Sequence, residues 1–288
     1  MNDKKITVHI GPPKTATTSL QFFLQKLDSR NIEYTGVFQP RHKNKERNKI
    51  RNNLFSFLTS GKDQKKKKVK AFINEIECQN LILSEEMILH GLNWRKKIRR
   101  LSSLLEDYSH VVKVCLRDPK DGIPSYYQEM YERLSPSLRY DYEAFVNSSY
   151  GDVYDYESVN CCLQEAGFAE VEWFTFERLI GGQLTIGEFI SNCSVDEKDR
   201  LISLRKENSS KRSGRKECKV VDFSYIDELG SWSRHLASLV ERMGPPGKRL
   251  VQKLRHGWKG HKEVRIGFTE REAELKKKYL RFLSSIPA

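Results

Sequence analysis

The sequence of 288 residues has no long hydrophobic run. None of its apolar stretches approaches the roughly 20 residues that a membrane-spanning helix needs. The opening residues, MNDKKITVHIG, contain no apolar signal core before the first strand-like segment. We therefore expect no membrane span and no secretory leader, and we expect the protein to be cytoplasmic.

Paired cysteine motifs are also missing. No CxxC pair occurs among the six cysteines, which are Cys78, Cys115, Cys161, Cys162, Cys193 and Cys218. Cys115 lies in an apolar run that is typical of a buried, reduced thiol. Cys161 and Cys162 would point to different faces of a helix, which makes them a poor pair of metal ligands. The sequence therefore predicts neither a bound metal nor a disulfide framework.

Acidic residues are outnumbered by basic ones. The chain has 51 Lys and Arg against 38 Asp and Glu, and its formal net charge is +13. Such a surface attracts anions, whether nucleic acid, nucleotide phosphates, anionic lipid or acidic polysaccharide. A run such as KDQKKKKVK (62–70) would steer a polyanionic acceptor or would only form a solvated helix face. No recognised nucleic-acid-binding module accompanies these runs, so we expect no nucleic-acid partner.

Strand-like and helix-like segments alternate along most of the chain. KKITVHI (4–10) alternates apolar and polar residues, whereas NLILS (80–84) and HVVKVCL (110–116) are apolar nearly throughout, like strands buried on both faces. Further strands are expected at 32–35 and 169–177. Helices are expected after the first strand, where Leu20, Phe23, Leu24 and Leu27 have helical spacing, and at about 48–59, 65–77, 93–107 and 268–284. Another helix is expected after the strand at 110–116, because Asp118 can cap a helix and Pro119 suits its first position.

This alternation predicts an α/β fold with an open, mainly parallel sheet flanked by helices and joined by right-handed crossovers. Residues 1–218 are expected to form this α/β domain. Residues 219–288 are expected to form a mostly helical extension packed on the same domain. No internal repeat is present.

The first strand leads into the stretch GPPKTATTS, residues 11–19. A turn between a strand and a helix exposes free backbone N–H groups at the positive end of the helix dipole, so it can bind an anion. The triphosphate-binding loop GxxxxGK[ST] would need glycine at Ala16 and lysine at Thr17, so this turn does not match it. No aspartate ends an apolar strand to hold magnesium, and a metal-dependent kinase is disfavoured.

Two segments resemble the donor-binding motifs of the sulfotransferases. GPPKTATTSLQ resembles their 5′-phosphosulfate loop, P-x-K-[ST]-[GA]-T-[ST]. VVKVCLRDPKDGIPSYY resembles their 3′-phosphate segment, in which an apolar strand is followed by R-[DN]-P and a serine eight residues after the arginine. The resemblance, which FTFERL near residue 177 extends, covers roughly residues 4–214 and implies a P-loop-like fold.

The resemblance implies that the donor is 3′-phosphoadenosine 5′-phosphosulfate (PAPS), bound at the carboxyl ends of the strands without a metal. Lys14 would contact the oxygen that bridges phosphorus and sulfur. The 5′-phosphate would be held by the rest of the loop, Pro13, Thr15, Ala16, Thr17 and Thr18. The 3′-phosphate would be bound by Arg117 and Ser125. LRKENSSKRSG (204–214) is similar to a late segment that closes over the nucleotide, with Asn208 and Ser210 as the matching residues.

The catalytic base has two acidic candidates. Many glycan-acting sulfotransferases follow the second central strand with Ser-x-Glu, and LSEEMI places Glu86 at that glutamate with Glu85 beside it. A partly desolvated carboxylate there would accept the proton of the acceptor hydroxyl. Either glutamate would otherwise be a first-turn helix charge, and His9 and His90 are the histidines nearest the motifs.

These features predict a sulfotransferase that transfers a sulfuryl group from PAPS to a hydroxyl of a carbohydrate-containing acceptor. Other hydroxyl acceptors, and acidic acceptors, are compatible with the same features. The alternatives are a P-loop-like small-molecule kinase and a non-catalytic polyanion-binding protein. The kinase would need magnesium and ATP, and the binding protein would bind polyanions without Lys14. The sequence does not identify the acceptor or the oligomeric state.

Overall fold

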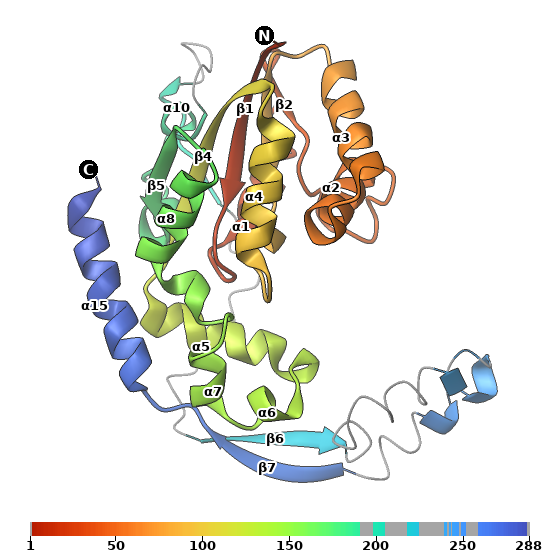
Figure 1. Cartoon of the computed structure of the whole chain (residues 1–288), viewed down its shortest axis with the longest axis vertical. Helices are drawn as coiled ribbons and strands as arrows, with labels where there is room; N and C mark the ends of the chain where they lie inside the picture. The colour runs from red at the N-terminus through yellow and green to blue at the C-terminus, as the bar shows by residue number, and fades with distance from the viewer. Residues whose placement is uncertain are drawn as a thin grey trace.

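An open sheet of five parallel strands forms the centre of the molecule in the computed structural model (Figure 1). The structure describes residues 2–190, 198–204, 218–224, 239–240, 242, 244–247, 249–251 and 259–286. The strand order is β2-β3-β1-β4-β5. The strands are β1 (Asn2–Ile10), β2 (Ile32–Tyr34), β3 (Asn80–Ser84), β4 (Tyr108–Leu116) and β5 (Val171–Thr175). The predicted open, parallel α/β sheet is confirmed.

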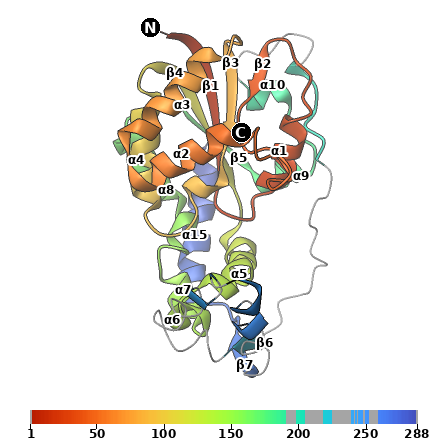
Figure 2. The same cartoon turned by 90° about the vertical axis from the view of Figure 1, so that its right-hand side faces the viewer.

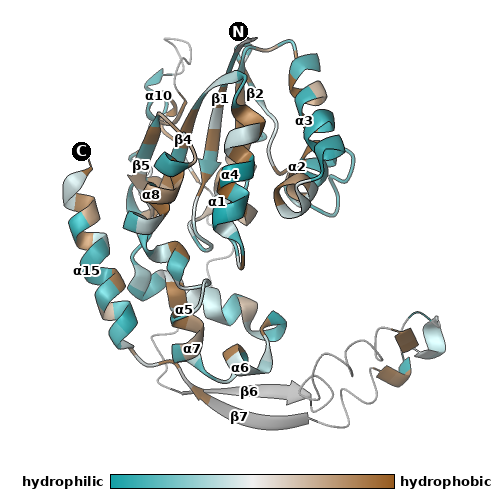
Figure 3. Ribbon diagram, viewed as in Figure 1, coloured by the Kyte–Doolittle hydropathy of each residue, from teal (hydrophilic) through white to brown (hydrophobic). Residues whose placement is uncertain are grey.

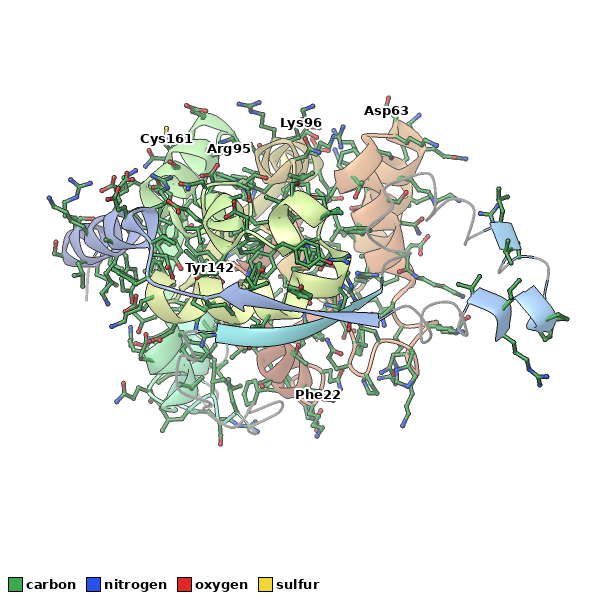
Figure 4. All side chains as sticks on the ribbon, turned by 90° about the horizontal axis from the view of Figure 1, so that it is seen from below. Phe22, Asp63, Arg95, Lys96, Tyr142 and Cys161 are labelled. Carbon is green, nitrogen blue, oxygen red and sulfur yellow. The ribbon has the colours of Figure 1, made fainter. Side chains whose placement is uncertain are left out.

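Helices cover both faces of this sheet (Figure 2). One face carries α1 (Thr17–Leu24), α9 (Phe176–Ile180) and α10 (Ile186–Phe189). The other carries α2 (Lys49–Ser60), α3 (Asp63–Glu75), α4 (Trp94–Leu105) and α8 (Tyr156–Glu165). In Figure 4, Asp63, Arg95, Lys96 and Cys161 of the second group lie on one side, and Phe22 of α1 lies on the opposite side.

The core consists of two apolar clusters, one on each face of the sheet. Ile6, Val8 and Ile10 of β1 belong to the larger cluster, under α2, α4 and α8, and Ile82 and Cys115 belong to the smaller one, under α1 and α10. Cys115 is a fully buried free thiol, as its apolar run predicted. Figure 3 shows hydrophobic colour along strands of the sheet and on parts of α4 and α8.

A second group of helices lies beyond the carboxyl ends of the strands (Figure 1). It contains α5 (Pro119–Met130), α6 (Pro136–Arg139) and α7 (Tyr142–Val146). Asp118 caps α5, since its side chain accepts the N–H of Lys120, and Pro119 is the first helical residue, as the sequence predicted. Short 3-10 turns follow β3 (η1, Glu86–Ile88) and α5 (η2, Tyr131–Arg133), and a third precedes α8 (η3, Asp152–Tyr154).

The C-terminal part adds an antiparallel pair of strands that the sequence did not predict. β6 (Cys218–Ser224) pairs with β7 (Lys259–Arg265), and the chain ends in α15 (Glu270–Ser285), close to the predicted helix. Each strand is stabilised by a partner more than 30 residues away, which local patterns do not reveal. Among the helices the structure describes, none has the length and apolarity needed to cross a membrane.

Candidate functional site

The turn between β1 and α1 has an unusual backbone. Lys14 and Ala16 both adopt the left-handed region, with φ of 70° and 59°. Non-glycine residues rarely do so, and such strained positions cluster at functional sites. Ala16 is the N-cap of α1 and supplies no side-chain cap, and the first helical hydrogen bond is from Leu20 N–H to the Ala16 carbonyl. The first turn of α1 therefore offers N–H groups to an anion.

Contacts inside the protein hold this turn in place. The Thr15 hydroxyl donates to the Pro12 carbonyl at 2.8 Å, and the Tyr154 hydroxyl donates to the Pro13 carbonyl at 2.7 Å. Gly11 is required by close packing, because a Cβ there would lie 2.7 Å from Thr15 Oγ1. The turn is thus shaped by its surroundings before any ligand binds.

Arg117 connects this turn to the end of β4. Its guanidinium donates a hydrogen bond to the carbonyl of Lys14, 103 residues away in the chain. The same group stacks over Phe176, with 4.5 Å between the guanidinium carbon and the ring centroid. The resemblance assigns Lys14 to the oxygen that bridges phosphorus and sulfur and Arg117 to the 3′-phosphate of the same nucleotide, and the structure places these two residues in contact.

Glu129 is a charged residue of this site that the sequence analysis missed. Its Oε2 lies 3.2 Å from Lys14 Nζ, and both side chains are partly exposed. It follows Ser125, the half-buried serine predicted to bind the 3′-phosphate, by one turn of α5. Residues four apart lie on the same face of a helix. The spacing of Glu129 from Ser125 is therefore the sequence feature that could have identified Glu129 as part of the site. In the structure Glu129 supplies the negative charge beside Lys14.

A nucleotide that contacts Lys14 must compete with Glu129. Adenosine 3′,5′-bisphosphate is the product that PAPS would leave after transfer of its sulfuryl group. We expect Glu129→Gln to tighten the binding of this bisphosphate by about 3- to 10-fold. An exposed ion pair contributes up to about 1 kcal/mol, and the variant also removes the negative charge near the nucleotide. Calorimetric titration measures the change. Glu132→Gln alters the net charge equally from an exposed position and is the control. Unchanged or weaker binding in Glu129→Gln contradicts the competition.

The two glutamates after β3 have different environments. Glu86 is 23% exposed and forms an ion pair with Arg41. Glu85 is fully buried: its carboxylate accepts the Met87 N–H at 3.0 Å and lies 3.3 Å from Arg51 Nε. Burial raises the pKa of the Glu85 carboxyl, while Arg51 opposes this shift. Of the two candidates for the base, Glu86 is the one that is exposed to solvent.

Lys97 holds the segment that carries Glu86. Its ammonium donates to the carbonyls of Met87 and His90, both at 2.6 Å, and burial lowers its pKa to about 8. The pKa of His90 is lowered to about 4, first by burial and then by Lys97, and Glu129 opposes the shift. His90 therefore lies within electrostatic reach of Glu129 and stays neutral near pH 7.

The remaining predicted residues have mixed surroundings. Thr17 is buried with its hydroxyl 3.3 Å from that of Thr15, and Thr18 is half-buried. His9 is fully buried against Phe174 and Phe189, and burial lowers its pKa to about 3.

Asn208 and Ser210 lie outside the described residues. Within the described part of the chain, no three His, Cys, Asp or Glu side chains are arranged to hold a metal ion.

No protein-family model matches the chain, and no curated protein matches it either. Among solved structures, the fold is similar to a crystal structure of mouse sulfotransferase SULT7A1 complexed with PAP. The TM-score is 0.34 and the sequence identity is 16%, over 62% of this chain and 54% of that one. This chain thus matches about half of the length of the mouse protein, and the likeness concerns the fold alone.

Proposed function

We propose that the protein is a sulfotransferase that transfers the sulfuryl group of PAPS to a hydroxyl of a carbohydrate-containing acceptor. The observation that supports this most is the contact of the Arg117 guanidinium with the Lys14 carbonyl. It joins the strand-to-helix turn after β1 to the arginine after β4, so one nucleotide can reach both. The carboxyl ends of parallel strands are also where open α/β sheets bind their ligands.

Each end of the nucleotide has its own set of groups in this proposal. The N–H groups of the turn and the dipole of α1 bind the 5′-phosphate, with Pro13, Thr15, Ala16, Thr17 and Thr18 forming the loop. Arg117 offers its planar fork to the 3′-phosphate, and the Ser125 hydroxyl completes that site. Stacking on Phe176 limits the positions that the guanidinium can take. Asn208 and Ser210 remain proposed ligands.

The reaction is a single displacement at sulfur. The acceptor oxygen forms a bond to sulfur while the bond from sulfur to the bridging oxygen breaks, and that electron pair stays on the leaving adenosine 3′,5′-bisphosphate. Lys14 stabilises the negative charge that grows on the bridging oxygen, a stabilisation that is larger in the transition state than in the ground state. Glu86 accepts the proton of the acceptor hydroxyl.

Charge near the site bears on the acceptor. Arg41 lies against Glu86, and Lys97, Arg133 and the acidic Glu129 are within electrostatic reach of His90. Basic residues therefore outnumber acidic ones around His90, which favours an acceptor with some negative charge. The lysine run on α3 is less available for steering, because Lys66 and Lys70 pair with Glu106 at the end of α4. A cytoplasmic location remains a prediction.

The proposed function is tested by transfer from isotopically labelled PAPS to panels of glycans, lipids and small alcohols. We expect labelled product with at least one carbohydrate-containing acceptor, without added metal. In parallel, adenosine 3′,5′-bisphosphate should raise the melting temperature more than ATP with magnesium does, since a ligand that binds only the folded state stabilises it. A rise in melting temperature with ATP and magnesium, and none with the bisphosphate, would favour the kinase alternative.

A further inference from the structure

The C-terminal helix α15 reaches the segment that carries Arg117. Lys276 of α15 forms an ion pair with Asp118, which directly follows Arg117 in the chain and is 158 residues from Lys276. The two side chains are 31% and 18% exposed, so the pair is partly shielded from water. Figure 1 shows α15 beginning near α5 and running alongside α8 and β5 toward the C-terminus.

Asp118 has two tasks at this position. One carboxylate oxygen, Oδ1, caps α5 by accepting the N–H of Lys120 at 3.0 Å. The other oxygen, Oδ2, faces Lys276. Because Asp118 directly follows Arg117 in the chain, loss of that ammonium would leave an unneutralised carboxylate next to the residue proposed to bind the 3′-phosphate, and its charge would oppose a bound dianion. The Lys276 ammonium therefore neutralises the Asp118 carboxylate. That carboxylate caps α5, but its negative charge would oppose a phosphate bound nearby.

Tyr156 also connects α15 to Arg117, because it contacts both. The Tyr156 hydroxyl accepts the N–H of Arg117 at 2.9 Å and donates to the carbonyl of the same residue at 2.7 Å. Its buried ring packs against Tyr279 and Phe282 of α15, with centroid separations of 5.8 and 6.3 Å. The tyrosine that fixes the backbone of Arg117 is thus covered by the C-terminal helix.

The rest of α15 is held firmly enough to act as a support. Its N-terminus has a complete capping box between Thr269 and Glu272, and Glu272 also accepts the Tyr142 hydroxyl at 2.9 Å. Lys278 lies 2.7 Å from Asp155, the N-cap of α8, and this contact lowers the pKa of Asp155 against the opposing effect of burial. Both contacts position Lys276 next to Asp118.

We propose that Lys276 is a positioning residue of the nucleotide site, which keeps Asp118 neutralised and Arg117 directed at the 3′-phosphate. This inference rests on the proposed function and gives α15 a part in donor binding. It predicts that Lys276 matters for ligands with a 3′-phosphate and hardly matters for ligands without one.

The test is calorimetric titration of the full chain with adenosine 3′,5′-bisphosphate and with adenosine 5′-monophosphate. We expect Lys276→Met to weaken binding of the bisphosphate by about tenfold, the size of coupling found between contacting charged residues, and to change binding of the monophosphate less than twofold. Lys277→Met removes the same charge from an exposed position on the same helix and should change neither affinity. Lys276→Arg should retain most of the bisphosphate affinity.

The Asp118→Asn variant separates positioning from general destabilisation. Asparagine still caps a helix but carries no charge. Asp118→Asn, alone or combined with Lys276→Met, should therefore bind the bisphosphate about as tightly as the unmodified protein. If the unmodified protein binds the bisphosphate and Lys276→Met binds it equally well, or if both ligands weaken together, the inference is wrong. If the unmodified protein does not bind the bisphosphate, the proposed function itself is wrong.

Discussion

Replacing Lys14 with alanine is expected to lower kcat by about 100- to 1,000-fold, the usual cost of removing one group that stabilises transition-state charge. The fold should remain intact, because the Lys14 side chain is partly exposed and its ion pair is with Glu129, which is also partly exposed. Steady-state kinetics with labelled donor measure the loss. Lys26→Ala removes a lysine from an exposed position just beyond the other end of α1 and should leave kcat unchanged.

Removing Lys14 also leaves Glu129 without its counter-ion, and this charge by itself would weaken nucleotide binding. The double variant Lys14→Ala with Glu129→Gln separates the two effects. It should recover much of the affinity for adenosine 3′,5′-bisphosphate but none of the lost turnover, because only the lysine acts on the bridging oxygen. Recovery of turnover in the double variant would mean that Lys14 acts only by neutralising Glu129.

Glu86→Gln is expected to lower kcat by roughly 100- to 10,000-fold, as loss of a general base does. The amide keeps the size and a hydrogen-bonding oxygen of the side chain but takes no proton. Binding of the bisphosphate product should change little, since Glu86 acts on the acceptor and not on the nucleotide.

Arg41 provides the control for Glu86, because the two side chains form an ion pair. Arg41→Met leaves the carboxylate in place and removes its partner. If Glu86 is the base, Arg41→Met should retain far more activity than Glu86→Gln. Equal losses would mean that the carboxylate serves to hold Arg41, and full activity in Glu86→Gln would assign the proton transfer to another group, such as His90.

The sheet and its flanking helices were predictable because their signals are local. The alternation in β1, the apolar runs of β3 and β4, and the apolar spacing from Leu20 each identify one element without reference to the others. The cap at Asp118 and the proline after it located the start of α5. The pairing of β6 with β7 was not predictable in this way, since those strands depend on each other across a long gap.

Part of the candidate site was predictable for a different reason. Lys14 and Arg117 follow neighbouring parallel strands, and the carboxyl ends of such strands meet at one edge of a sheet, which explains their contact. Glu129 and Lys276 are charged residues on helices, where charges are usually solvated, and the only local signal was the four-residue spacing of Glu129 from Ser125. Their relevance comes from tertiary contacts with Lys14 and Asp118, at separations of 115 and 158 residues, which only the folded chain reveals.

The central claim is that one nucleotide spans the turn at Lys14 and the guanidinium of Arg117. Calorimetric titration with adenosine 3′,5′-bisphosphate, adenosine 5′-monophosphate and adenosine 3′-monophosphate tests it most directly. The account predicts that the bisphosphate binds more tightly than either monophosphate, and that Arg117→Ala reduces its affinity to about that of the 5′-monophosphate. Equal affinities for all three ligands, or tight binding of the bisphosphate that survives Arg117→Ala, would contradict it.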